Sequence, residues 1–191
     1  MTTETSADLR NLLLPGWLDS DAAHWQSRWE ALHDCRRVEQ NDWLWPKRGD
    51  WMARLDEVLL ESEQPAVLIA HSLGCQLVAA WAAHSRHTAQ VRGALLVAMP
   101  DPERDDTPPN LFSWRPIIRQ RLPFASLAVI SSDDPHCVPG RAEQMARDWG
   151  ASAVDIGPCG HVNSTSGLGD WPQGRALLQT LLDRSQTIAR W

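Results

Sequence analysis

Short apolar runs alternate with longer amphipathic stretches along this sequence. A short, continuous apolar run is typical of a strand buried on both faces of a parallel sheet, and apolar residues every three or four positions are typical of a helix that packs on such a sheet. The alternation therefore predicts an α/β fold, with a six-stranded, mostly parallel sheet and helices on both faces. The length of 191 residues suits one domain, which we expect to span residues 1–191.

The expected strands are apolar runs that end at turn residues, and they cover residues 11–14, 36–39, 66–70, 93–99, 126–131 and 151–156. The second run is the weakest, and we expect it at an edge of the sheet. The expected helices cover residues 21–33, 49–62, 73–83, 140–149 and 172–188. In the first helix, Asp19 or Ser20 is the expected amino-terminal cap, and the expected buried stripe consists of Trp25, Trp29 and Leu32.

Charge and composition argue against several partners and locations. The formal net charge is −6 and the basic residues form no dense stripe, so nucleic acid and anionic membrane surfaces are poor partners. The apolar runs are far shorter than the ~20 residues of a membrane-spanning helix. Residues 1–8 have neither the basic nor the apolar section of a signal peptide, and we expect a cytoplasmic protein.

Two residue types carry further information. The four cysteines form no CxxC pair, which indicates reduced packing thiols and no zinc site. The 11 tryptophans, against two phenylalanines and no tyrosine, are expected mainly in the core, with one or two of them lining a pocket. The segment 100–125 contains six prolines, which favours a loop with short helical turns and leaves no room for a large cap.

The segment most informative about chemistry is Ala70-His71-Ser72-Leu73-Gly74, which lies between an apolar strand and a helix of small residues. A nucleophile elbow has this arrangement, because a sharp strand-to-helix turn holds a serine in strained backbone and needs small neighbours two positions before and after it. The segment therefore predicts Ser72 as a nucleophile. The alternative is a serine at an ordinary turn between a strand and a helix.

A nucleophile of this kind needs an acid and then a histidine, each after a later strand. Two aspartates follow the strand 126–131, and we favour Asp134 over Asp133, with the other as a turn or capping residue. His161 lies in the glycine-rich loop after the last strand, in the required order. His71 is interpreted as structural support or a pocket wall, and we expect the remaining histidines at the surface or packed on helices: His24, His33, His84, His87 and His136.

These residues predict acyl chemistry. Ser72 attacks a carbonyl carbon, His161 takes the proton and later gives it to the leaving group, and Asp134 orients the imidazole. Two backbone N–H groups are expected to bind the oxyanion: that of Leu73, directly after the nucleophile, and that of Trp17. Gly16 would allow this loop to approach the serine closely, although Pro15-Gly16 is also compatible with a plain tight turn.

The order of these motifs resembles the small cap-less α/β-hydrolases, a family that includes the retinoblastoma-binding serine hydrolase and its bacterial relatives. The resemblance extends from about residue 11 to 182 and is carried by Leu14-Pro15-Gly16-Trp17, His71-Ser72-Leu73-Gly74, Ser132-Asp133-Asp134-Pro135 and Gly160-His161-Val162-Asn163, with His24-Trp25 and the segment 166–172 as further matches. It implies a single-domain α/β-hydrolase fold without a large cap, the triad Ser72, Asp134 and His161, and no metal or organic cofactor. It implies no particular substrate.

We therefore expect a serine hydrolase that cleaves small to medium carboxylic esters, with thioesters and amides as further candidates, and whose partners are an acyl substrate and water. The expected pocket walls are Leu18, Met99, Trp114 and Val138. The alternative is a protein-binding module on a hydrolase scaffold with weak or incidental catalysis, since a fold does not fix a function. The complete triad argues against that alternative. Acyl transfer to an acceptor other than water would use the same residues.

Overall fold

The computed structural model describes residues 9–188, with side chains up to residue 184. Six parallel strands form one sheet in the order β2-β1-β3-β4-β5-β6, with β2 at an edge as expected. Their bounds are β1 Arg10–Leu14, β2 Cys35–Arg37, β3 Ala66–His71, β4 Val91–Val97, β5 Ala125–Ile130 and β6 Ser152–Asp155. The six-stranded prediction is confirmed, and every strand pair in the described sheet is parallel.

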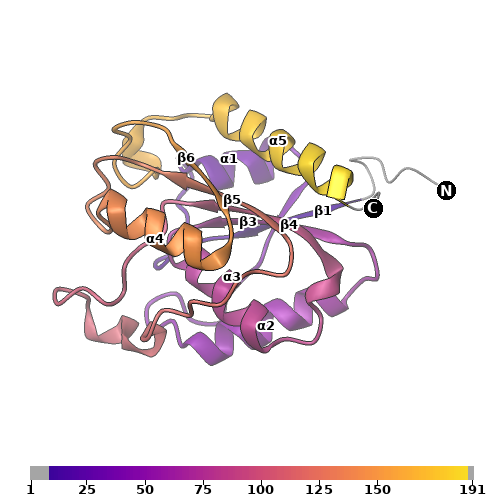
Figure 1. The fold of residues 1–191 in the computed structure, drawn as a ribbon, viewed down its shortest axis with the longest axis horizontal. Coiled ribbons are helices and arrows are strands. Elements are labelled where there is room, and N and C mark those ends of the chain that lie inside the picture. Colours follow the sequence, from indigo (N-terminus) through magenta and orange to yellow (C-terminus); the bar gives the residue numbers. More distant parts are fainter. Residues whose placement is uncertain (1–8, 189–191) are drawn as a thin grey trace.

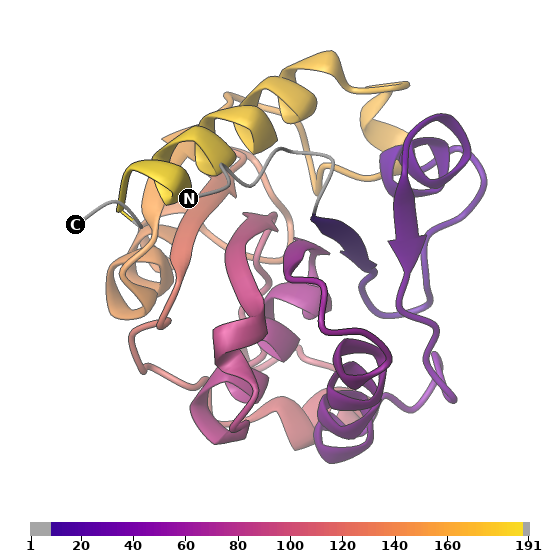
Figure 2. The same ribbon diagram turned by 90° about the vertical axis from the view of Figure 1, so that its right-hand side faces the viewer.

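Helices cover both faces of the sheet. Helices α1 and α5 lie on one face, and α2, α3 and α4 lie on the other (Figures 1 and 2). Their bounds are α1 Trp25–Leu32, α2 Arg48–Leu60, α3 Leu73–His84, α4 Pro139–Trp149 and α5 Pro172–Ile188. None of the helices described has the length and apolar character that crossing a lipid bilayer requires.

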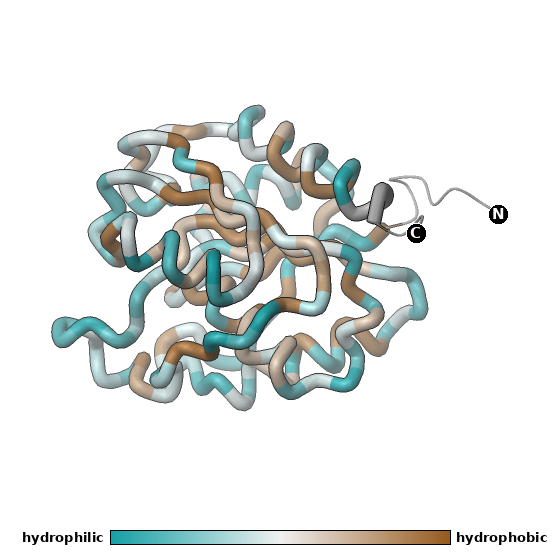
Figure 3. Tube along the Cα trace, in the orientation of Figure 1, coloured by the Kyte–Doolittle hydropathy of each residue, from teal (hydrophilic) through white to brown (hydrophobic). Residues whose placement is uncertain are grey.

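Strand β3 shows why the central runs are apolar throughout. Leu68 and Ala70 pack into the core under α2, α3 and α4, whereas Val67 and Ile69 pack into the core under α1 and α5. Both faces of the strand are therefore buried, and Figure 3 shows hydrophobic residues concentrated along the sheet. Tryptophans fill both cores as expected, and seven of them are fully buried: Trp25, Trp29, Trp51, Trp81, Trp114, Trp149 and Trp171.

Helix α1 differs from its prediction at both ends. It begins at Trp25 rather than at residue 21, because the carboxylate of Asp21 accepts hydrogen bonds from the N–H groups of Ala23 and His24 and holds this segment in a turn. His24, not Asp19 or Ser20, caps the helix, since its Nδ1 accepts the N–H of Gln26 at 3.1 Å. Leu32 is exposed and does not belong to the buried stripe.

The proline-rich segment between β4 and β5 forms no cap. Its regular structure is a short 3-10 helix at Pro109–Trp114, in agreement with the prediction of a loop with helical turns. The four cysteines are free thiols, of which Cys75 and Cys137 are buried.

Candidate active site

Ser72 occupies the sharp turn between β3 and α3. Its backbone has φ 53° and ψ −123°, a conformation that costs a non-glycine residue about 1–3 kcal/mol. The turn requires a glycine at position 74, because a Cβ there would lie 2.2 Å from the carbonyl oxygen of Leu14. It also requires Gly16, where a Cβ would lie 2.7 Å from the Cβ of Ser72. The elbow is therefore packed directly against the loop that follows β1.

The structure brings Ser72, His161 and Asp134 together. The Oγ of Ser72 lies 2.8 Å from Nε2 of His161, and Nδ1 of His161 lies 2.9 Å from both carboxylate oxygens of Asp134. A carboxylate only accepts hydrogen bonds, so Nδ1 carries the proton and Nε2 is free to accept the hydroxyl of the serine. The side chains of His161 and Asp134 are 10% and 3% exposed, which shields this pair from water.

The two neighbouring aspartates have different positions. Asp134 is buried, and one of its carboxylate oxygens also accepts the N–H of His136 at 2.9 Å. Asp133 points elsewhere: its carboxylate accepts the N–H of Gly160 at 2.7 Å and the hydroxyl of Ser131 at 2.9 Å. These hydrogen bonds, that of Gly160 first, lower the pKa of Asp133. Asp133 therefore fastens the loop that carries His161 and does not contact its imidazole.

His71 supports the same loop from the other side. Its Nε2 donates to the backbone carbonyl of His161 at 2.8 Å. Burial, the largest cause, holds the pKa of His71 well below its usual range, so the ring is neutral and Nε2 carries its proton. The structure therefore agrees with the interpretation of His71 as structural support.

Two further histidines near the site were assigned no role from the sequence. The ring of His136 stands edge-on to that of His161, with centroids 4.5 Å apart, and the ring of buried His24 stands 4.6 Å from that of His71. Burial lowers the pKa of both, that of His24 to about 4. For His136, the available sequence signal is its position two residues after Asp134. The capping role of His24 depends on packing that spacing does not reveal.

Two backbone N–H groups beside the serine have no acceptor among the described residues. Leu73 is the first residue of α3, so its N–H has no carbonyl one turn earlier. The N–H of Trp17 follows Gly16 in the loop packed on Ser72, and it donates to no atom of the described chain. Both donors are thus unpaired within the described residues.

Comparison with known proteins identifies the family. The sequence pattern of the family described as serine hydrolase matches residues 11–180. This chain belongs to the serine hydrolase family. A comparison with curated protein sequences finds no match.

Solved structures resemble this serine hydrolase over nearly its whole length. A YdeN-like hydrolase from Pectobacterium atrosepticum has a TM-score of 0.83 at 29% identity, covering 94% of each chain. The YdeN gene product of Bacillus subtilis has a TM-score of 0.70 at 18% identity, covering 92% of this chain and 99% of that one. An esterase from a Rhodococcus species has a TM-score of 0.65 at 15% identity, with coverage of 94% and 92%. The last two likenesses concern the fold alone, and the predicted α/β-hydrolase fold is confirmed.

The expected pocket of the serine hydrolase needs correction. Leu18 and Val138 are exposed, as pocket walls must be, but Met99 and Trp114 are each only 1% exposed. Trp114 packs edge-on against Trp51 and donates its indole N–H to the carbonyl of Pro46 at 2.7 Å. Both residues are core residues under α2, α3 and α4 and offer a substrate almost no surface. Trp114 and Met99 fail as pocket residues because both pack into this core, Trp114 against the segment that contains Pro46 and Trp51.

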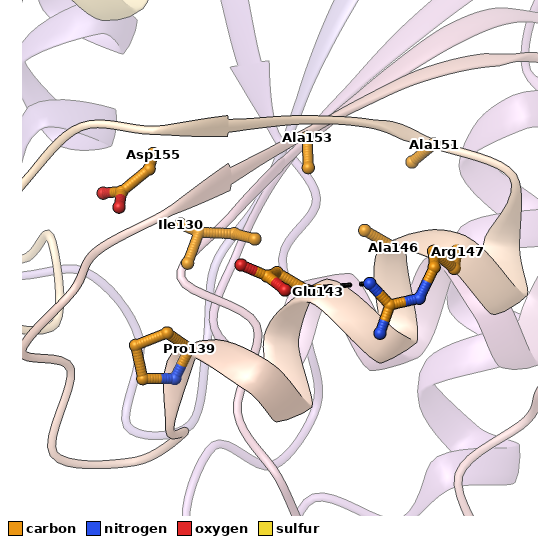
Figure 4. A pocket seen from close by; sticks show the side chains of 8 residues that line it. All are labelled: Ile130, Pro139, Glu143, Ala146, Arg147, Ala151, Ala153 and Asp155. Atoms are coloured by element: carbon orange, nitrogen blue, oxygen red, sulfur yellow. Dashed lines mark ion pairs between the residues drawn. The ribbon is translucent and has the colours of Figure 1, made fainter.

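Two hollows on the described surface of the serine hydrolase are lined by residues other than Ser72, His161 and Asp134. One, of about 390 Å³, lies between β6 and α4 and is lined by Ile130, Pro139, Glu143, Ala146, Arg147, Ala151, Ala153 and Asp155 (Figure 4). The other, of about 650 Å³, lies at the amino ends of β4 and β5. Within residues 9–188 no three His, Cys, Asp or Glu side chains are grouped closely enough to hold a metal ion.

Proposed function

We propose that this serine hydrolase cleaves small to medium carboxylic esters, with thioesters and amides as further candidates, through an acyl-enzyme on Ser72. The observation that carries the proposal is the 2.8 Å hydrogen bond between Ser72 Oγ and His161 Nε2, with Asp134 at the opposite nitrogen of the imidazole. A serine hydroxyl is a weak nucleophile until an adjacent base takes its proton, and this arrangement supplies the base and its orienting group.

In the first half-reaction, Ser72 Oγ attacks the carbonyl carbon while its proton passes to Nε2 of His161. The imidazolium that forms is stabilised by the carboxylate of Asp134. Collapse of the tetrahedral intermediate breaks the bond to the leaving alkoxide, which receives the proton from Nε2. The acyl group remains as an ester on Ser72.

The developing oxyanion needs donors that are already aligned. The free N–H groups of Leu73 and Trp17 are the proposed donors, and each such donor is worth roughly 3–4 kcal/mol of barrier. Ser72 stands at the amino end of α3, where the helix dipole also favours negative charge.

In the second half-reaction, a water molecule takes the place of Ser72 as the nucleophile. Nε2 of His161 takes a proton from the attacking water, and the new hydroxyl bond to the acyl carbon displaces Ser72 Oγ, which regains its proton from the imidazolium. The products are a carboxylic acid and free enzyme. These steps need no group other than the residues named and water.

We also propose that the protein is related to the retinoblastoma-binding serine hydrolase, that it is cytoplasmic, and that it has neither nucleic-acid nor membrane partners. A protein partner is the remaining alternative role for the same scaffold.

The proposal is tested with a fluorophosphonate probe, which labels activated serines, and with a panel of 4-nitrophenyl esters. We expect labelling and turnover in the wild type, with turnover lowered roughly 10⁴–10⁶-fold in Ser72→Ala and strongly lowered in His161→Ala. Ser132→Ala, at an exposed serine next to Asp133, is the matched control and keeps both activities. Equal ester turnover in wild type and Ser72→Ala would refute the proposal.

A further inference from the structure

Large hydrophobic side chains are exposed mainly at one edge of the sheet. Seven are exposed within the described chain, and five of them lie on loops that follow the carboxyl ends of strands, the edge that carries Ser72: Leu18, Leu44, Trp45, Phe112 and Val138. The other two, Leu32 and Leu60, lie near the carboxyl ends of α1 and α2. Scattered exposed hydrophobics need no explanation, but a concentration beside a reactive group points to a ligand.

Four of these side chains belong to loops that are tied to one another, and we call them the apolar rim: Leu18, Leu44, Trp45 and Phe112. The indole of Trp17 donates to the carbonyl of Leu44 at 3.1 Å, and the N–H of Leu18 donates to the carbonyl of Trp43 at 3.2 Å. The rim is thereby joined to the loop whose Trp17 N–H is a proposed oxyanion donor.

The loop that carries Phe112 is tied to the same place. The amide of Asn110 donates to the carbonyl of Leu44 at 2.6 Å, and the hydroxyl of Ser113 donates to the carbonyl of Pro46 at 3.2 Å. Asp42 fixes the other end of this turn, because its carboxylate accepts the N–H groups of Leu44 and Trp45. The polar groups of these loops thus bond to one another, which leaves the apolar side chains of the rim facing solvent.

We propose that the apolar rim binds the acyl part of the substrate, which would then be an ester of an apolar, medium-length carboxylic acid. This inference rests on the proposed function. It follows from the order of the strands: Leu18 follows β1, and Leu44 and Trp45 follow β2, on one side of Ser72. Asp134 and His161 follow β5 and β6, on the other side.

The chemistry then assigns the two halves of the ester. His161 protonates the leaving group, so the leaving group lies on the β5–β6 side, where Val138 is exposed. The oxyanion is directed at the N–H groups of Trp17 and Leu73. The acyl group takes the remaining direction, toward β1 and β2, where Leu18, Leu44 and Trp45 of the rim lie. Phe112 follows β4, but the hydrogen bond of Asn110 to Leu44 ties its loop to this side. Burying hydrocarbon on this rim removes apolar surface of both partners from water.

The test is a chain-length series of 4-nitrophenyl esters, from acetate to octanoate, below the concentrations at which the esters aggregate. We expect kcat/KM of the wild type to rise with chain length, by up to about fourfold for each methylene that becomes fully buried, the equivalent of about 0.8 kcal/mol. Trp45→Ala is the principal variant, since this side chain is 61% exposed and its loss leaves the core intact. It should lower the octanoate-to-acetate ratio of kcat/KM at least tenfold.

Leu60→Ala is the matched control, an exposed apolar residue near the end of α2, and it keeps the wild-type ratio. A flat dependence of kcat/KM on acyl chain length overturns the inference, and so does an equal octanoate-to-acetate ratio in wild type and Trp45→Ala. The proposed function is unaffected by either result as long as acetate hydrolysis depends on Ser72. A second series consists of acetate esters of alcohols of increasing length. If Trp45→Ala changes the chain-length dependence of kcat/KM in this series and not in the acyl series, the inference is overturned in favour of leaving-group binding. Loss of a dimer in Trp45→Ala with an unchanged ratio overturns it in favour of self-association. Hydrolysis that persists in Ser72→Ala refutes both proposals.

Discussion

The imidazole of His71 donates from Nε2 to the backbone carbonyl of His161 across 2.8 Å. The residue directly before the proposed nucleophile therefore holds the loop that carries the proposed base. This hydrogen bond joins the end of β3 to the segment after β6, which are far apart in the sheet. It helps to hold together the two side chains that exchange a proton in the proposed mechanism.

Replacement of His71 by phenylalanine should slow the reaction more than it weakens substrate binding. The ring shape is kept, but the carbonyl of His161 loses its buried donor, which costs about 1–3 kcal/mol. We expect kcat to fall roughly 10- to 100-fold at nearly unchanged KM, as measured with 4-nitrophenyl butanoate. A loss of thermal stability with unchanged kcat would assign His71 to structure alone, and partial recovery of kcat in His71→Gln, which keeps a donor, would support the positioning role.

Mutation of the two neighbouring aspartates should affect activity and stability differently. Asp134→Asn leaves the shape intact but presents the wrong hydrogen-bonding group to Nδ1 of His161, and we expect kcat to fall about 10⁴-fold. Asp133→Asn keeps an oxygen that can accept from Gly160 and Ser131 but removes its charge, which weakens both hydrogen bonds without touching the imidazole, so its main effect should be a slightly lower melting temperature. Steady-state kinetics and thermal unfolding of both variants check this assignment. A larger loss of kcat in Asp133→Asn than in Asp134→Asn would contradict it.

Gly16 gives a steric test of the contact between the oxyanion loop and the elbow. A Cβ at this position would lie 2.7 Å from Cβ and 3.1 Å from Oγ of Ser72, so Gly16→Ala must displace one of the two loops. Since a displacement of about 1 Å costs catalysis on the order of 100-fold, we expect at least that loss in kcat/KM. Gly49→Ala in α2 meets no atom within 4 Å and is the control. It should keep full activity and change the free energy of unfolding by at most about 1 kcal/mol.

The sequence predicted those parts of the fold and the candidate site that depend on local pattern. Strand β3, the strained turn at Ser72 and helix α3 form one continuous segment, so apolar character and small residues were sufficient to predict them. The order of acid and histidine could also be predicted, because each follows a strand that its own apolar run indicates. The environments of Asp133 and His136 were not, because they depend on contacts with loops distant in sequence.

Burial of individual side chains was harder to predict than the elements that carry them. Trp114 and Trp45 are both tryptophans in loops at the same edge of the sheet, yet one is fully buried and the other is largely exposed. The difference arises from a hydrogen bond of the Trp114 indole to Pro46 and from its packing on Trp51, and neither partner is near it in the sequence. Local pattern therefore predicted which groups come together around Ser72 better than which side chains face solvent there.

The buried cap of α1 should make the protein less stable in mild acid. Burial lowers the pKa of His24 to about 4, against an ordinary value of 6.5. Between these values the unfolded chain binds more protons than the folded one, so the stability from this group is complete above pH 6.5 and is lost as pH falls toward 4, by about 3 kcal/mol in total. Desolvation is the main cause, since His24 is buried with Nε2 unpartnered in the described structure.

His24→Asn isolates this effect, because asparagine keeps a cap acceptor for the N–H of Gln26 and does not titrate. The difference in free energy of unfolding between wild type and His24→Asn, from urea titrations at pH 7.5, 6, 5 and 4.5, should shift steadily in favour of the variant as pH falls. Burial lowers the pKa of His71 in both proteins, and the neighbouring His24 lowers it further in the wild type alone, so the contribution of His71 to this difference has the same sign as that of His24. His33→Asn, at an exposed histidine, is the matched control and should keep the wild-type slope. Parallel pH profiles of wild type and His24→Asn would show that His24 is not held neutral by the fold.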